Sequence, residues 1–256
     1  MTSFTSPLQV RYACRENRLT TVASRALPGY LCLNVVMMDR EYAGEFEAFC
    51  RANPKPCPLL KVTSAGQPGC PEFAEGLDIR TDLGSYDILR GGEVVEQRKE
   101  VADLFDDRTV TFLIGSSVSF DGLLAEKGYK PAFGPCIQLT GLDCEPVGIF
   151  KGKIAVTLRS FAPEVTDAVW EYTSHFPQCH GAPLGKNNAD DLGIQNPDLT
   201  ISGRQIDVPE GTDRLYWACG VTPSLVAQQA RLPLVLSYTP GHALITDIPT
   251  ERLYQG

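Results

Sequence analysis

Apolar residues gather in short runs along this chain, separated by polar, proline-rich or glycine-rich stretches. Residues 31–37 and 109–114 are rich in apolar and β-branched side chains, which is typical of strands buried on both faces. Residues 153–161 alternate between apolar and polar positions and predict another strand. Residues 215–219 predict a fourth, and short strands are expected around residues 59–62.

Helical spacing of apolar residues is clearest in two stretches. Asp39 can cap a helix that runs to about residue 52, and Pro163 suits the first position of a second helix. The expected core-facing residues are Tyr42, Phe46, Phe49 and Cys50 in the first helix and Val165, Ala168, Val169 and Tyr172 in the second. Short helices are also expected over residues 101–105 and just before Gly128.

The order of these elements predicts the fold class. Strands and helices alternate unevenly, and a hairpin is expected over residues 86–96, so a simple Rossmann or barrel pattern is excluded. We predict a mixed α/β (α+β) chain of two interlocked lobes, with mixed sheets and flanking helices. Residues 130–150 are rich in proline and glycine, which suggests lobes 1–142 and 143–256 within one domain of 256 residues.

Charge and composition narrow the range of partners. The net charge is −8 and no basic stretch occurs, which argues against nucleic acid and anionic membranes. The apolar runs are too short to span a bilayer. An acidic protein can still bind an acidic metabolite through a local arginine or a helix end. We therefore expect a small-molecule acid as the ligand, and a homo-oligomer is possible.

Cysteine usage indicates a reducing compartment. The chain has nine cysteines, no Cys-x-x-Cys pair, and no apolar run after its first residues of the kind a secretory signal has. We expect reduced thiols in a cytoplasmic protein. Zinc is disfavoured because Cys179 and His180 are adjacent in sequence and the remaining ligand spacings are missing.

Residues 217–223 predict the end of a strand, a tight glycine turn and the start of a helix. Thr222 has the chemistry of an N-cap, and Pro223 suits the first helical position. The free N–H groups beyond Gly220 favour an anion, and the Cys219 thiol stands beside them. A buried structural cysteine before an ordinary capped helix would give the same pattern.

A similar turn follows the strand at residues 109–114. Ser117 and Ser119, with the free N–H groups around them, could hold a carboxylate or a phosphate. The spacing is not that of a P-loop and no lysine follows, so nucleotide binding is disfavoured. Serines that only cap a helix are the alternative.

The three histidines differ in their surroundings. His175 lies near the end of a predicted helix, where positive charge is favourable, and we expect it to be structural. His180 precedes a Gly-Ala-Pro loop and His242 lies on a Pro-Gly turn, so both have room to face a cleft. Histidine suits proton transfer near neutral pH.

Several short motifs occur in a fixed order between Gly29 and Pro249. They are Asn53-Pro54-Lys55-Pro56-Cys57-Pro58, Arg80-Thr81-Asp82-Leu83, Phe112-Leu113-Ile114-Gly115, Ser119-Phe120, Cys144-Glu145-Pro146, His180-Gly181-Ala182-Pro183, Trp217-Ala218-Cys219-Gly220-Val221-Thr222-Pro223, Pro240-Gly241-His242 and Ile245-Thr246-Asp247. In this respect the chain resembles the D-glutamate cyclase-like family of hydro-lyases. The resemblance implies a soluble two-lobed α/β fold and, for at least one branch, dehydration of D-glutamate to 5-oxo-D-proline.

The chain also departs from that family's pattern. Where relatives carry Met-Tyr-Arg-Thr, residues 136–140 read Cys-Ile-Gln-Leu-Thr, with no arginine. Ser116 replaces a cysteine, and Leu184-Gly185 replaces Val-His. If the missing arginine holds a substrate carboxylate in the relatives, this protein acts on a different molecule or has lost activity.

Cyclisation of glutamate needs a base that takes a proton from the ammonium and an acid that protonates the departing oxygen. We expect His180 and His242 to act as this pair across a cleft, without a metal or an organic cofactor. Cys219 could form a thioester, although a shaping role suits it better. The other candidates are Asp121 and Glu145 as acids or bases, Arg80 and Arg159 as carboxylate clamps, and Ser117, Ser119, Gly220 and Thr222 as substrate-binding groups.

Two alternatives to a D-glutamate cyclase-like lyase remain open from the sequence. One is a tailoring enzyme on another substrate, and the other is an inactive binding protein of the same fold. A lyase predicts that His180 and His242 converge on one pocket with an arginine. A binding protein predicts that the histidines are buried separately, or that residues 136–142 fill the pocket.

Overall fold

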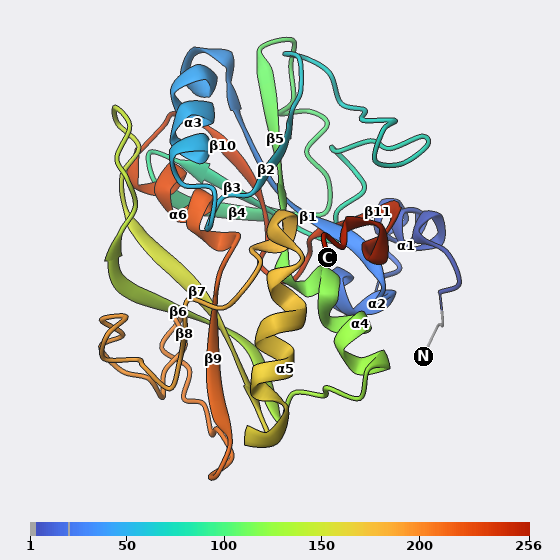
Figure 1. Cartoon of the computed structure of the whole chain (residues 1–256). Helices are drawn as coiled ribbons and strands as arrows, with labels where there is room; N and C mark the ends of the chain where they lie inside the picture. Colours follow the sequence, from blue (N-terminus) through green and yellow to red (C-terminus); the bar gives the residue numbers. More distant parts are fainter. Residues whose placement is uncertain (1–3, 20) are drawn as a thin grey trace.

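The computed structural model describes residues 4–19 and 21–256, whose strands form two sheets (Figure 1). The larger sheet has the order β2-β5-β1-β10-β3-β4, with β11 also paired to β1, and the smaller has the order β6-β7-β9-β8. The strands are β1 (Tyr30–Asp39), β2 (Leu59–Val62), β3 (Tyr86–Arg90), β4 (Glu93–Arg98), β5 (Thr109–Gly115), β6 (Phe133–Asp143), β7 (Lys153–Phe161), β8 (Gly185–Lys186), β9 (Asp213–Ala218), β10 (Val235–Tyr238) and β11 (Leu244–Pro249).

Helices flank both sheets (Figure 1). The α-helices are α1 (Pro7–Arg15), α2 (Ala23–Ala26), α3 (Arg40–Ala52), α4 (Asp121–Glu126), α5 (Pro163–Ser174) and α6 (Val221–Gln229), and the 3-10 helices are η1 (Ser117–Phe120), η2 (Pro177–Cys179) and η3 (Thr250–Leu253). Within the described ranges, every helix is too short or too polar to cross a bilayer.

The larger sheet is built around β1, which is buried along almost its whole length. Strand β1 pairs antiparallel with β5 on one edge and with β10 and β11 on the other. The Asp39 carboxylate accepts the Glu41 N–H at 2.8 Å and caps α3, as predicted. On this helix Phe46 packs edge-to-face against Phe112 of β5, with centroids 4.7 Å apart, which fastens α3 to the sheet.

The smaller sheet has two buried faces. Leu158 of β7 and Tyr216 of β9 belong to a cluster on the face covered by residues 184–212. Phe161 and Trp217 lie on the other face, within the main hydrophobic core. The Trp217 indole donates to the Thr173 hydroxyl at 3.3 Å and so ties this face to α5 (Figure 1).

The two sheets meet where β5 and β9 end, since Asn34 of β1 contacts both Gly115 and Gly220. The main core includes Leu33 and Leu113 of the larger sheet together with Phe161 and Trp217 of the smaller one. Helix α6 follows β9 and contacts β7, β1 and β10, so it bridges the sheets. We call this region the junction. It also receives η1 and α4, which follow β5 directly.

The fold class is confirmed, and several finer expectations are corrected. All pairings among the described strands are antiparallel, whereas mixed sheets were expected. Residues 130–150 contain strand β6, so the expected boundary at 142/143 falls inside a strand, and β10 and β11 return to the larger sheet. Residues 101–105 form a turn rather than a helix.

Two local expectations also differ. Ala168 is exposed, and the buried face of α5 instead includes Thr166 and Thr173, whose hydroxyls bond to helix carbonyls and so can be buried. Helix α6 begins at Val221, two residues before Pro223, because the chain turns into the helix directly after Gly220.

Candidate active site at the junction of the two sheets

Arg159 is the centre of the polar groups at the junction. It lies on β7, opposite Leu215 of β9, and its side chain is completely buried. Its guanidinium stacks over the rings of Phe120 and Trp217, at 5.4 and 5.2 Å from the centroids. These two rings hold the guanidinium in one orientation, because lateral movement would lose both contacts.

Only part of the Arg159 hydrogen-bonding capacity is used. One terminal nitrogen, NH2, lies 2.9 Å from an Asp121 carboxylate oxygen and donates to the Ser117 hydroxyl at 3.3 Å. The buried Nε and NH1 nitrogens have no partner among the described residues. Unpaired N–H groups on a buried cation are costly, and a carboxylate is the group that a guanidinium fork binds best. Nε and NH1 lie on opposite edges of the guanidinium, so each presents a separate N–H to an acceptor such as a carboxylate oxygen.

Asp121 is the acidic partner of Arg159 and the more accessible of the two. Burial raises the pKa of its carboxyl above the ordinary value, while the Arg159 charge opposes that rise. The Asp121 side chain is 35% exposed, so water reduces the effect of burial. Asp121 can therefore exchange protons with solvent or with a ligand held beside it.

His180 follows η2 in a left-handed conformation, with φ of +74°, and its side chain is buried. Its Nδ1 lies 2.9 Å from the Lys55 carbonyl oxygen. A carbonyl can only accept, so Nδ1 carries the proton in the neutral ring and Nε2 has a free lone pair. The Nε2 atom is buried without a partner among the described residues, so it can accept a proton from a ligand.

The charge of His180 follows from its surroundings. Burial lowers the pKa of the ring to about 4, and the positive charges of Lys55 and Arg159 act in the same direction. The hydrogen bond to the Lys55 carbonyl and the nearby Gly115 carbonyl oppose the shift but do not overcome it. His180 is thus neutral at pH 7. A bound anion would raise its proton affinity by offsetting the two cations.

Cys219 lies at the end of β9 and is almost fully buried. Burial raises the pKa of its thiol, although contacts with the Thr157 hydroxyl, the Val221 N–H and the Arg159 charge oppose the rise. The group is therefore a neutral thiol in the free protein rather than the thiolate that a nucleophile requires. Its position favours a role in shaping the site.

Asn34 connects the predicted glycine turns. Its side-chain amide donates to the Gly115 carbonyl at 3.1 Å. A Cβ added to Gly220 would lie 1.6 Å from the same amide nitrogen, so only glycine fits there. Asn34 was not among the expected site residues. The sequence did contain a signal for this residue, because Asn34 is the one polar residue in the apolar run 31–37.

Thr222 and Ser119 hold the backbone of the junction together. The Thr222 hydroxyl accepts the Ala155 N–H at 3.0 Å, so it ties α6 to β7 and is not the N-cap that was expected; Gly220 occupies that position. The Ser119 hydroxyl accepts the Cys32 N–H and donates to the Ser116 carbonyl. These contacts leave neither hydroxyl directed at a ligand. Of the expected hydroxyls, only that of Ser117 contacts Arg159.

His242 lies away from this group. It is half-buried beside Gly84, and burial together with the Lys99 charge lowers the pKa of its ring. Among the described residues, no hydrogen bond or charge interaction joins it to His180 or Arg159. The expected pairing of His180 with His242 therefore has no support in this geometry.

Arg80 and Glu145 also lie outside the junction contacts. The Arg80 guanidinium forms its carboxylate fork with Asp78, at 2.9 and 2.8 Å, two residues earlier in the chain. Glu145 is exposed, and its main-chain N–H and carbonyl both bond to the Asn53 side chain. Arg80 is therefore not available to a ligand carboxylate, because the neighbouring Asp78 already occupies its guanidinium fork.

The altered segment at residues 136–140 lies on β6. The Gln138 side chain points away from the junction and donates to the Pro197 and Leu199 carbonyls, both at 2.9 Å. Leu139 pairs with Ala155, in the row of β7 residues that includes Arg159, and is 41% exposed. Ile137 lies in the same row and packs, half-buried, against the main core, so the segment contributes one apolar side chain to this face.

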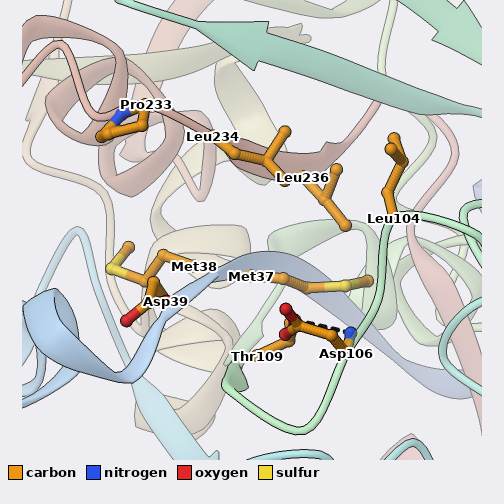
Figure 2. A pocket seen from close by; sticks show the side chains of 9 residues that line it. All are labelled: Met37, Met38, Asp39, Leu104, Asp106, Thr109, Pro233, Leu234 and Leu236. Atoms are coloured by element: carbon orange, nitrogen blue, oxygen red, sulfur yellow. Dashed lines mark hydrogen bonds between the residues drawn. The ribbon is translucent and has the colours of Figure 1, made fainter.

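A separate pocket lies at the far end of β1. Figure 2 shows its lining, which is mostly apolar and includes Met37, Leu104 and Leu236. Its carboxylates already have partners: Asp39 bonds to Arg108, and Asp106 accepts the hydroxyl of Thr109 at 2.9 Å. We place the candidate active site at the junction instead. Within the described residues no cluster of metal-ligating side chains occurs.

The matching family model and the similar curated proteins indicate the same family for this chain. The D-glutamate cyclase family model matches residues 110–247. The chain is 35% identical to "Putative hydro-lyase YcsI" of Bacillus subtilis strain 168, over 97% of this chain and 98% of the relative. It is 37% identical to a "Putative hydro-lyase" of Stutzerimonas stutzeri strain A1501, over 97% and 96% of the two chains. A Staphylococcus carnosus strain TM300 relative with the same description is 34% identical over 96% of both.

Proposed function

The chain belongs to the D-glutamate cyclase family of hydro-lyases, and from this premise we propose that it converts D-glutamate to 5-oxo-D-proline and water. The reaction forms a bond between the amine nitrogen and the side-chain carboxyl carbon and breaks a carbon–oxygen bond. Two protons of the ammonium leave with the oxygen as water. The reaction is redox-neutral, so the proposal requires no electron carrier.

The observation that carries the proposal is the buried Arg159 guanidinium, whose Nε and NH1 have no partner. A substrate carboxylate would accept an N–H from one of these nitrogens, since Nε and NH1 lie on opposite edges of the guanidinium and each presents its own free donor. Arg159 and Lys55 are positive and His180 is neutral, so the balance near the junction is positive both with Asp121 ionised and with Asp121 protonated, the form in which it can act as an acid. Glutamate carries a net negative charge at neutral pH, so its charge complements these groups.

Proton transfer falls to His180 and Asp121 in this proposal. The free Nε2 lone pair of His180 takes a proton from the substrate ammonium, which must become neutral before it can attack. The carboxylate held by Arg159 raises the proton affinity of His180 at that moment. Asp121, whose pKa burial raises, delivers a proton to the departing oxygen. Cys219 shapes the site as a neutral thiol.

Another small acid as substrate is the alternative, and Leu139 favours it. This apolar, partly exposed side chain lies in the same row across the sheet as Ala155 of β7. It could accept an apolar substituent that glutamate lacks. A tailoring enzyme with the same dehydration chemistry would then fit the junction.

The test is to incubate the purified protein with D-glutamate and to follow the loss of one water by mass spectrometry, with chiral chromatography of the product. L-glutamate and a panel of other amino and dicarboxylic acids serve as comparison substrates. Formation of 5-oxo-D-proline that is lost in Arg159→Met supports the proposal. Turnover of another acid alone would favour the alternative, and no turnover of any acid would favour a binding protein.

A further inference from the structure

Lys55 lies in the proline-rich segment between α3 and β2. Pro54 and Pro56 flank it in a turn that the Cys57 N–H and the Asn53 carbonyl close at 3.0 Å. Prolines offer no N–H to compete for the neighbouring carbonyls, so the Lys55 carbonyl is available to another part of the chain. That carbonyl accepts the Nδ1 proton of His180.

The Lys55 side chain reaches the same loop by a second route. Its ammonium donates to the Ala182 carbonyl, two residues beyond His180. Between them, His180 and Gly181 both have positive φ, of +74° and +62°. Two successive left-handed residues, one of them a histidine, persist only where surrounding contacts hold them. Lys55 supplies such contacts at both ends of the turn.

The Lys55 ammonium is unusual in having no counter-ion. Among the described residues it makes no ion pair, although it is partly buried, and burial lowers the pKa of its amino group. Lys61, six residues later, is more typical: it is 44% exposed and paired with Glu72. An uncompensated ammonium costs stability and needs another explanation.

We propose that Lys55 is the positioning residue of His180: its carbonyl selects the Nδ1–H tautomer, and its ammonium fastens the turn and places a positive charge beside the ring. This role rests on the proposed function, in which His180 is the base. The groups that face the His180 ring are the Lys55 charge and carbonyl, the Gly115 carbonyl and the Arg159 charge, the last of which is paired with Asp121.

The test separates the charge of Lys55 from its hydrogen bond. Lys55→Gln keeps an N–H donor for the Ala182 carbonyl but removes the charge, and Lys55→Met removes both. Lys61→Gln is the matched control on a nearby exposed lysine. NMR of ¹⁵N-labelled imidazoles follows His180 directly, because the chain has three histidines and the other two can be assigned with His175→Gln and His242→Gln.

In the wild-type protein we expect the Nδ1–H tautomer and a titration midpoint near 4 for His180. Lys55→Gln raises the midpoint by about 0.5 pH unit or more and keeps the tautomer, since a nearby positive charge is lost. Lys55→Met raises the midpoint and adds a population of the Nε2–H tautomer. Lys61→Gln leaves both unchanged.

A His180 midpoint in Lys55→Gln equal to that of the wild type would overturn the proposal, as would an equal shift in Lys61→Gln. Circular dichroism checks that each variant folds. If Lys55→Met does not fold, the result for Lys55→Gln decides the test. The measurement does not depend on turnover. If D-glutamate is not converted but His180 responds as expected, the proposed reaction fails and the positioning role stands. If D-glutamate is converted but the His180 midpoint is unchanged in Lys55→Gln, the proposed reaction stands and the positioning role fails.

Discussion

The Arg159 guanidinium lies 2.9 Å from the Asp121 carboxylate, yet the two side chains differ sharply in exposure: the arginine is completely buried and 35% of the aspartate side chain is accessible. The guanidinium is held between the rings of Phe120 and Trp217, whereas the carboxylate is partly exposed to solvent. This arrangement presents positive charge inward and a proton-exchanging group outward, which suits an anionic ligand.

Arg159→Lys should lower kcat/KM for D-glutamate by roughly 10–100-fold, because a lysine ammonium cannot reproduce the planar set of N–H donors that the guanidinium presents at Nε, NH1 and NH2. Steady-state kinetics measures the loss. Arg214→Lys is the control: it lies on β9 and pairs with Asp198 at 2.7 Å. Equal losses in both variants would show that any paired arginine of this sheet matters, and not the junction in particular.

His180→Gln should lower kcat by roughly 10²–10⁴-fold, since the free Nε2 lone pair is the proposed base. His242→Gln should leave kcat within a factor of about 3, because no interaction among the described residues joins His242 to the junction groups. The same steady-state assay compares both variants. A large loss in His242→Gln would restore the two-histidine mechanism expected from the sequence.

Stability should fall as the pH drops from about 6.5 towards 4. His180 has a pKa of about 4 in the folded chain against 6.5 in an unfolded one, so the unfolded state binds more protons in this window. At pH 5 the group removes about 2 kcal/mol of the stability present at pH 7.5. Urea unfolding at a series of pH values measures this, and His180→Gln should show a correspondingly flatter profile.

Gly115→Ala should destabilise the fold by about 3 kcal/mol or more and displace His180. A Cβ there would lie 1.7 Å from the Gln178 carbonyl oxygen, so the backbone of η2 must move. Gly44→Ala is the matched control, because Gly44 lies in α3 with open space around it and should gain about 0.5–1 kcal/mol. Thermal and urea unfolding of the two variants should move in opposite directions.

Thr222→Val should cost about 1–3 kcal/mol, because the buried Ala155 N–H loses its acceptor. Thr222→Ser keeps the hydroxyl and should lose clearly less. Urea unfolding of the three proteins provides the measurement. A larger loss in Thr222→Ser than in Thr222→Val would indicate that the methyl packing of Thr222 matters more than the hydrogen bond between α6 and β7.

Local pattern predicted much of the secondary structure. The run 31–37 became β1 and residues 153–161 became β7, because continuous or alternating burial follows from side-chain period alone. Asp39 caps α3 as predicted, since capping involves only neighbouring residues. The pattern failed for β6, where the prolines and glycines of residues 130–150 indicated a loop although the strand pairs with β7 along one edge.

For the candidate site, the sequence by itself determined the residue types and the family: an arginine, hydroxyls, histidines and glycine turns in a fixed order. Only the tertiary structure decided which of them meet. It brought Arg159, Asp121 and Ser117 together, left His242 and Arg80 elsewhere, and added Asn34 and Lys55. The physical reason is that hydrogen bonds and charge interactions act over a few ångströms, while these residues lie far apart along the chain and meet only through strand pairing.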